Sequence, residues 1–263
     1  MQIYNPPLDT NLKNSLETLL QESVSDSTNR NNYLYLVENT DEIESLDTKL
    51  SSIFPSDANV FVNTLFLETA LRLRACETQL RERGVTVISD YSDPFNSRED
   101  KLVSFHSSED CRPFISHVYN EIMAGLSDLI QEHGGLASPI GSDQLPDFPC
   151  KIDTDILVCI PDKSDYLSFC NRLKEGKVFA IPPQSIGDKH VFFYAQLLGS
   201  PVDLHVCNDV LEENSLYRQA MQLRNNSDLQ QKYRQFKINN EGSSASAYRK
   251  AKSLFRKNAG WSQ

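Results

Sequence analysis

Within the first hundred residues, the spacing of the hydrophobic positions alternates between that of a helix and that of a β-strand. Apolar residues recur at helical spacing over residues 12–20, whereas residues 33–37, Tyr-Leu-Tyr-Leu-Val, form a β-prone run. Gly84 suits the left-handed end of a helix. Residues 1–106 are expected to form a mixed α/β region, whose role no motif indicates. Its further predicted elements are helices over residues 41–53 and 58–84 and a strand over residues 85–88.

Beyond this region, short apolar strands alternate with helices, and the chain ends in a helical tail. A helix is predicted over residues 108–133, where Gly134 and Gly135 stop it. The chain is therefore expected to be an α/β protein of the α+β type. Its second domain, residues 107–263, is expected to hold a short mixed sheet backed by helices. The remaining predicted elements are strands over residues 136–140, 152–160, 190–198 and 202–207, a helix over residues 164–174, and a tail over residues 211–258 with two or three helices.

The length, charge and cysteine pattern of the chain limit its possible domain organisation, partners and location. A chain of 263 residues suits one domain with an extension or a small second domain. The formal net charge of −10 argues against a general electrostatic hold on a nucleic acid or an anionic membrane, so any nucleic acid must be gripped locally. The six cysteines are scattered along the chain and are therefore expected to be reduced thiols. With no signal peptide and no apolar run long enough to span a bilayer, the expected location is the cytoplasm, without a membrane partner.

The candidate chemistry centres on an acidic motif in the predicted strand over residues 152–160. Because side chains alternate along a strand, Asp153 and Asp155 should project from one face, about 6 to 7 Å apart. Two carboxylates about 4 Å apart repel by about 4 kcal/mol at an effective dielectric near 20, and a divalent cation offsets this repulsion. Asp203 is a third acid in an apolar strand and shares a face with His205. Three carboxylates suit magnesium, with manganese as a substitute.

A Gly-Ser turn before this strand could hold phosphates. Gly141 permits a close backbone approach, and Ser142 with the adjacent amides could donate hydrogen bonds to a triphosphate. Taken singly, each feature has an ordinary explanation: an Asp-x-Asp strand is commonly a solvated edge, Gly-Ser is a turn, and Asp203 could protect a sheet edge. Their order along the chain favours a site for a metal and a nucleotide.

These residues resemble the GrpB-like branch of the nucleotidyltransferase superfamily over residues 110–258. The family pattern opens with Gly-Ser, passes through a Pro and a Lys, and ends in an Ile-Asp-Ile strand. Two positions depart from it, since Asp147 replaces a glycine and Ile152 replaces a proline. The matching residues are Gly141, Ser142, Pro146, Lys151, Asp155-Ile156, Leu204-His205-Val206, Tyr233-Arg234-Gln235-Phe236-Lys237 and the segment from Tyr248 to Phe255.

The resemblance implies a nucleotidyltransferase fold that transfers a nucleoside monophosphate from a triphosphate such as ATP, with two magnesium ions. It assigns Asp153 and Asp155 to both metals, and Asp203 to the nucleophile-side metal and to a role as base. The acceptor, whether RNA, protein or a small molecule, is not implied. The expected nucleotide-binding residues are Gly141, Ser142, Lys151, Lys250 and Lys252.

Several alternatives stay open at this point. Lys151 could instead be a solvated loop residue, and a neighbouring carbonyl could satisfy His205. The basic tail could be the exposed face of an amphipathic helical pair, or it could grip the triphosphate or a polyanionic acceptor such as RNA. The alternative to an enzyme is a nucleotide-binding or protein-interaction module without catalysis, in which residues 1–106 dock a partner. The basic residues of the tail are Lys232, Arg234, Lys237, Arg249, Lys250, Lys252, Arg256 and Lys257.

Overall fold

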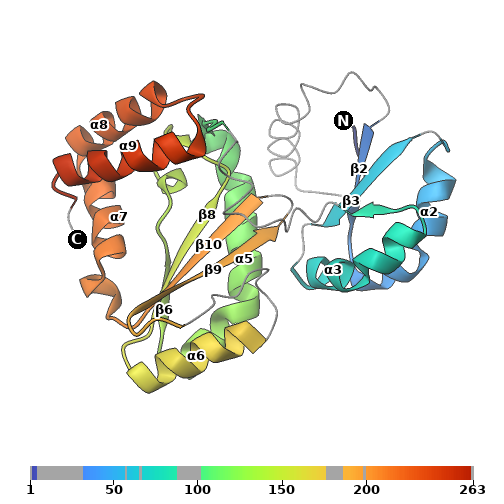
Figure 1. Ribbon diagram of the computed structural model, residues 1–263, viewed down its shortest axis with the longest axis horizontal. Helices are drawn as coiled ribbons and strands as arrows, with labels where there is room; N and C mark the ends of the chain where they lie inside the picture. Colours follow the sequence, from blue (N-terminus) through green and yellow to red (C-terminus); the bar gives the residue numbers. More distant parts are fainter. Residues whose placement is uncertain are drawn as a thin grey trace.

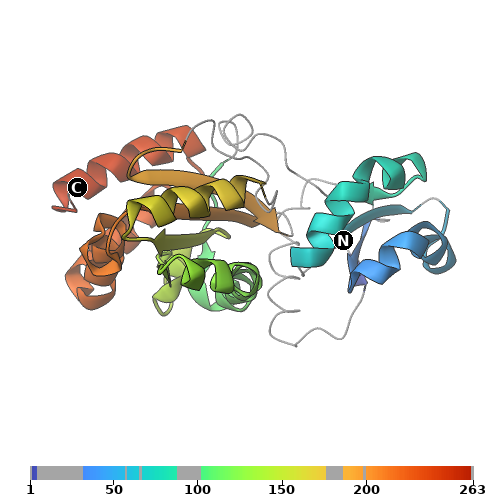
Figure 2. The same cartoon turned by 90° about the horizontal axis from the view of Figure 1, so that it is seen from below.

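The computed structural model of the chain has two lobes (Figures 1 and 2). The N-terminal lobe holds the elements up to β4, and the C-terminal lobe holds those from β5 onward. The helix predicted over residues 12–20 lies outside the described part of the chain. The structure describes residues 2–4, 32–56, 58–64, 67–87, 102–175, 186–197 and 200–261.

The N-terminal lobe is built on a parallel sheet with the strand order β1-β2-β3-β4. Its core includes Tyr35 and Val37 on one face of β2, Val62 on β3 and Leu73 on α3. The strand predicted at residues 33–37 is confirmed. The elements are β1 (Gln2–Tyr4), β2 (Asn32–Val37), the 3-10 helix η1 (Thr40–Ser45), α2 (Leu46–Ile53), β3 (Asn59–Thr64), α3 (Leu67–Glu82) and β4 (Thr86–Val87).

The prediction of one continuous helix over residues 58–84 is wrong in its first part. Residues 59–64 form β3, which lies between β2 and β4, and the helix α3 begins only at Leu67. A short apolar run cannot be assigned to helix or strand by its period, and the β-branched Val60, Val62 and Thr64 favour the strand once two partner strands are present. The helix end was predicted correctly, since Gly84 has a φ of 83°.

The C-terminal lobe contains a small mixed sheet with the strand order β6-β8-β10-β9. Strands β8 and β10 are parallel, whereas β6–β8 and β9–β10 are antiparallel. The molecule is therefore a mixed α/β protein of the α+β type, as predicted. The elements from β5 to β10 are β5 (His106–Ser107), α5 (Ser108–Glu132), β6 (Leu136–Pro139), the 3-10 helix η2 (Ser142–Gln144), β7 (Pro149–Cys150), β8 (Thr154–Cys159), α6 (Lys163–Glu175), β9 (His190–Leu197) and β10 (Ser200–Cys207).

The two faces of this sheet have different partners. On one face, Ile156 of β8 and Leu204 of β10 are buried in a core with Val118, Ile122 and Leu126 of α5. The buried residues of α5 are spaced by three and four positions, so they form the single face of the helix that packs on the sheet. Figure 1 shows α5 on this side of the sheet and the helices α7, α8 and α9 on the other. The second face is thus left for the helical tail.

The tail is helical in several pieces, as predicted. Asn214, Asn226 and Ser244 cap the three α-helices, each accepting a hydrogen bond from a backbone amide of the first turn. The turn between α8 and α9 is held by Val103, whose amide donates to the Ser243 carbonyl at 2.8 Å. Among the described helices, none combines the length and the apolarity needed to cross a membrane. The tail consists of η3 (Leu211–Glu213), α7 (Ser215–Asn225), α8 (Ser227–Asn239) and α9 (Ala245–Asn258).

Candidate functional site

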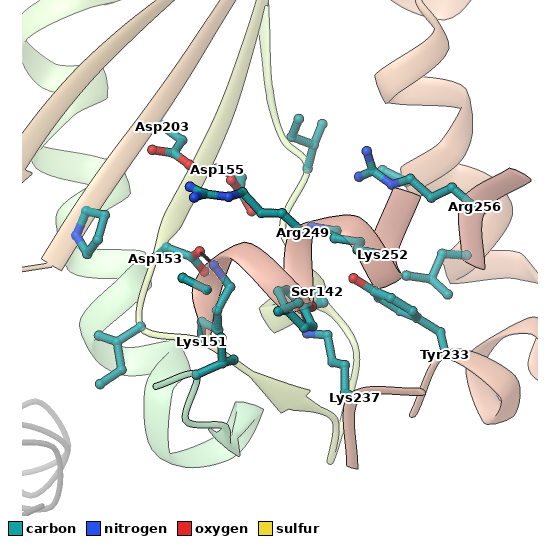
Figure 3. Close-up of a pocket in the computed structure, with 18 of the residues that line it drawn as sticks. Ser142, Lys151, Asp153, Asp155, Asp203, Tyr233, Lys237, Arg249, Lys252 and Arg256 are labelled. Atoms are coloured by element: carbon teal, nitrogen blue, oxygen red, sulfur yellow. Dashed lines mark hydrogen bonds and ion pairs between the residues drawn. The ribbon is translucent and has the colours of Figure 1, made fainter. Parts of the chain in front are cut away.

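The three predicted aspartates lie together at one end of the C-terminal sheet. Asp155 on β8 and Asp203 on the parallel strand β10 are direct register partners. Asp153 immediately precedes β8. One carboxylate oxygen from each aspartate lies within 4.8 Å of the other two. Figure 3 shows the three carboxyl groups converging on one region.

The alternation of side chains along β8 explains why the aspartates point away from the core. Thr154 and Ile156 are almost fully buried on the face that α5 covers. Asp153 and Asp155 therefore share the opposite face, as predicted from their spacing, and both line a cavity together with residues of the helical tail. Because β10 runs parallel to β8 with Leu204 opposite Ile156, Asp203 is placed on the same face as Asp155.

The three carboxylates of this cluster lie close enough to repel one another. Burial, together with the negative charges of Asp153 and Asp203, raises the pKa of Asp155 to about 7. Burial also opposes ionisation of Asp153, but the Lys151 ammonium outweighs it and lowers the pKa of Asp153. A hard divalent cation would relieve this repulsion, and three carboxylate oxygens, from β8, from β10 and from the residue before β8, are a donor set that suits magnesium or manganese.

Lys151 is part of this cluster and is not a freely solvated loop residue. Its ammonium forms an ion pair with Asp153, and its side chain is 37% exposed. Burial acts to lower the pKa of Lys151, but the carboxylates of Asp153 and Asp155 outweigh it and the pKa is raised. Lys151 also lines the cavity beside the aspartates, so its charge is available to a phosphate once a cation neutralises the carboxylates.

The Gly-Ser turn lies directly against the acidic cluster. A Cβ atom at position 141 would meet the end of the Asp143 side chain and lie 3.7 Å from Oδ2 of Asp155, so glycine lets the turn approach the cluster without displacing the Asp143 carboxylate. Asp143 itself is buried, and burial raises the pKa of its carboxyl group. Ser142 follows at the start of η2 and lines the cavity.

Lys237 of α8 links the helical tail to this turn. Its ammonium donates to Ser142 Oγ at 2.6 Å and to the Pro149 carbonyl at 2.7 Å. It also lies 5.2 Å from the ring centres of Phe105 and Tyr233. The side chain is 2% exposed, and burial lowers the pKa of Lys237. The sequence singled out Lys237 only as one of several basic residues of the tail, and its place in the matched Tyr233–Lys237 segment was the available signal.

Helix α9 supplies a basic wall opposite the aspartates. Arg249, Lys252 and Arg256 are spaced by three and four residues, so they share one face of the helix, and all three line the cavity. Figure 3 shows them along α9, between the aspartates and the adjoining helix. Lys250 is exposed and lies outside this cavity, because a step of two residues turns a side chain to the far side of a helix. The cavity has a volume of about 600 Å³.

His205 lies beside Asp203 in the cavity wall, on the face predicted for it. A second imidazole is its partner, because Nδ1 of His205 lies 3.1 Å from Nε2 of His190. The two rings are stacked with their centres 5.3 Å apart. Burial and the neighbouring His190 lower the pKa of His205 to about 4, which keeps this imidazole neutral at pH 7.

Comparison with known proteins finds no match for this chain. The chain matches no protein-family model, no curated protein and no solved structure. The site therefore has to be interpreted from its own geometry. Of the predicted residues, the structure gathers Asp153, Asp155, Asp203, Gly141, Ser142, Lys151 and Lys252 in one place, and it leaves Lys250 outside.

Proposed function

We propose that the chain is a metal-dependent nucleotidyltransferase with a nucleotidyltransferase fold of the GrpB-like type. It transfers a nucleoside monophosphate from a nucleoside triphosphate to an acceptor. The observation that carries this proposal is the cavity between Asp153, Asp155 and Asp203 on one side and the basic face of α9 on the other. A polyanion with a bound cation is the ligand that satisfies both walls together.

The resemblance seen in the sequence supports the same proposal. Its matching residues come from four separate segments, and one or more residues of each segment line the cavity. The departure at Asp147 also has a simple conformational explanation. Asp147 has a φ of 45°, which is the left-handed region that favours glycine, and it is the one non-glycine residue with positive φ in the described part of the chain. The residues shared by the matching segments and the cavity are Ser142, Lys151, Asp155, His205, Tyr233, Lys237, Tyr248, Arg249 and Lys252.

In this proposal the side chains bind and orient the reactants. The three aspartates would hold magnesium, which would supply charge neutralisation on the phosphates and a lower pKa for the acceptor hydroxyl. Lys252 and Arg249 face the triphosphate from α9, and the hydrogen bond from Lys237 fixes Ser142 in the turn beside it. A bond forms from the acceptor oxygen to the α-phosphorus as the bond to pyrophosphate breaks. Asp203 accepts the proton of the acceptor.

The test is incubation of the purified chain with α-labelled ATP, GTP, CTP or UTP, magnesium and cell extract. Label should pass into a protein, RNA or small-molecule fraction, with release of pyrophosphate. The Asp153→Ala/Asp155→Ala variant should lose both this transfer and the magnesium-dependent binding of the triphosphate. Retained binding in the double variant would contradict the site. Thermal stabilisation by nucleotide without pyrophosphate release would indicate the non-catalytic binding module instead.

A further inference from the structure

One end of the cavity is built differently from the region around the aspartates. There α7 presents Leu216, Gln219, Ala220 and Leu223, which are spaced by three, four and seven residues and therefore form one face of the helix. Trp261, which follows α9, closes the same cavity and is only 6% exposed. This wall is mostly apolar, in contrast to the charged walls that hold the metal and the phosphates.

Three polar atoms in this part of the cavity lining have no hydrogen-bond partner among the described residues. They are Oε1 of Gln219, Nε of Arg256 and Nε1 of Trp261, and all three are buried. A buried polar atom without a partner is costly, and such atoms are uncommon in folded proteins. None of the three atoms has surface accessible from the cavity in this structure, so a ligand would supply the missing hydrogen bonds once these side chains turn toward it.

The chemistry of this wall suits a nucleobase. An indole Nε1 can only donate a hydrogen bond, and a guanidinium Nε also donates, whereas the Gln219 amide can accept or donate. A base offers ring-nitrogen or carbonyl acceptors and N–H donors along one edge, with apolar faces above and below. The flanking side chains of Leu216 and Leu223 suit those faces.

The position of the wall along α9 agrees with this assignment. Arg256 follows Lys252 by four residues, which is one helical turn, or about 6 Å. Lys252 is placed to face the phosphates, so Arg256 lies about one turn farther from the aspartates. Figure 3 shows Arg256 at the far end of this face of α9 from Arg249. A triphosphate bound at the metal would thus reach this wall with its nucleoside.

We propose that α7, Arg256 and Trp261 form the base-recognition subsite, in which Gln219 and Trp261 read the edge of the nucleobase. This inference rests on the proposed function, since it takes the phosphate end to lie at the aspartates. Loss of Gln219 or Trp261 as a hydrogen-bonding group should therefore weaken binding of the nucleoside part alone. Binding of the phosphate part should be unchanged.

The experiment compares nucleotides with tripolyphosphate, which lacks the nucleoside. Affinities of the full chain for ATP, GTP, CTP, UTP and tripolyphosphate are measured by titration calorimetry with magnesium. The wild-type chain should bind at least one nucleotide about tenfold more tightly than tripolyphosphate, and it should discriminate among the bases. Gln219→Leu and Trp261→Phe should each lose at least fivefold in affinity for the preferred nucleotide and keep the affinity for tripolyphosphate within twofold.

Gln222→Leu is the matched control, because Gln222 lies on the same helix, is exposed and does not line the cavity. It should leave all five affinities unchanged. Trp261→Phe retains an aromatic ring in the cluster with Tyr233 and Phe255, and Gln219→Leu tests the same subsite without touching that cluster. Equal binding of nucleotides and tripolyphosphate by the wild type, or full base discrimination in both variants, would overturn the subsite. Absence of any magnesium-dependent triphosphate binding would overturn the proposed function, and the subsite with it.

Discussion

At the scale of single residues, the acidic cluster brings three carboxylates together against their mutual repulsion. Asp155 lies beside Asp153 and Asp203 in the cavity lining, and its pKa is raised to about 7. The alternation of side chains along a strand predicted that Asp153 and Asp155 would share a face. The pKa depends on the additional approach of Asp203 from another strand and on the burial of the site by the tail.

This pKa predicts how the stability of the metal-free protein changes with pH. The folded-state pKa of Asp155 lies above the ordinary carboxyl value of 3.8, so the folded protein retains a proton that the unfolded chain has lost. The free energy of unfolding should therefore fall as pH rises from about 4 to about 7, by about 3 kcal/mol, and level off above pH 8. Urea denaturation in the presence of a chelator, at pH 5, 6, 7 and 8, measures this.

Asp155→Asn is the informative variant for this prediction. It removes the titrating group at the same size, so the pH-dependent loss should become smaller and the variant should be more stable than the wild type at pH 8 without metal. Added magnesium should reverse that order, because only the wild type has the complete carboxylate set. Asp128→Asn, on the exposed face of α5, serves as the control. A pH profile of Asp155→Asn that is parallel to the wild type would contradict the assigned pKa.

The left-handed residue of the turn gives a second prediction at this scale. Asp147 has a φ of 45°, and its ion pair with Arg234 is exposed and contributes little. Asp147→Gly should therefore be as stable as the wild type or more so, whereas Asp147→Ala should be about 1 kcal/mol less stable than Asp147→Gly. Both variants lack the carboxylate, so the difference between them isolates the backbone conformation. Equal unfolding midpoints for the two in urea would rule out a left-handed conformation at this position.

At the scale of elements, the orientation of α9 decides which basic residues reach the cavity. The sequence identified a basic helix but paired Lys250 with Lys252, although a step of two residues places their side chains on opposite sides of the helix. The rotation of α9 about its axis is fixed by Tyr248, which is buried and packs against Phe236 and Phe105. The helix itself was predictable from its own residues, but this rotation requires the packing of the tail.

Charge reversal at these two lysines gives a matched test of the orientation. Lys252→Glu should weaken magnesium-dependent binding of tripolyphosphate by about tenfold or more, because it places a negative charge in the wall facing the phosphates. Lys250→Glu changes the net charge of the chain by the same amount on the exposed side of α9, and it should change the affinity by less than twofold. Both are measured by titration at constant ionic strength. Equal losses in the two variants would mean that α9 acts only through its overall charge.

At the scale of the whole molecule, strand β2 contributes side chains to the cores of both lobes. Tyr35 and Val37 belong to the core of the N-terminal lobe, whereas Leu36, which points to the other face of the strand, belongs to the core of the C-terminal lobe. Leu36 is 1% exposed. The sequence indicated a strand here and a boundary near residue 106, but not that a strand of the first lobe would contribute to the core of the second.

Because Leu36 belongs to the N-terminal lobe but packs in the C-terminal core, the stability of the C-terminal lobe should depend on this residue. Leu36→Ala should destabilise the C-terminal lobe by about 2 to 4 kcal/mol. Val37→Ala, in the adjacent position, should mainly destabilise the N-terminal lobe. Trp261 is the single tryptophan of the chain and lies in the C-terminal lobe, so its fluorescence during urea denaturation reports that lobe. A larger shift of the tryptophan transition for Val37→Ala than for Leu36→Ala would contradict this arrangement.

The sequence by itself determined the features that depend on neighbours along the chain. These are the α+β class, most helices and strands, and the alternation that separates Asp155 from Ile156. Local sterics and periodicity decide such features. Only the tertiary structure decided that Asp155 meets Asp203, and that Lys237 reaches Ser142 from 95 residues away. Strand order, and the rotation of each tail helix against the sheet, depend on how the two faces of that sheet are packed, which no local pattern specifies.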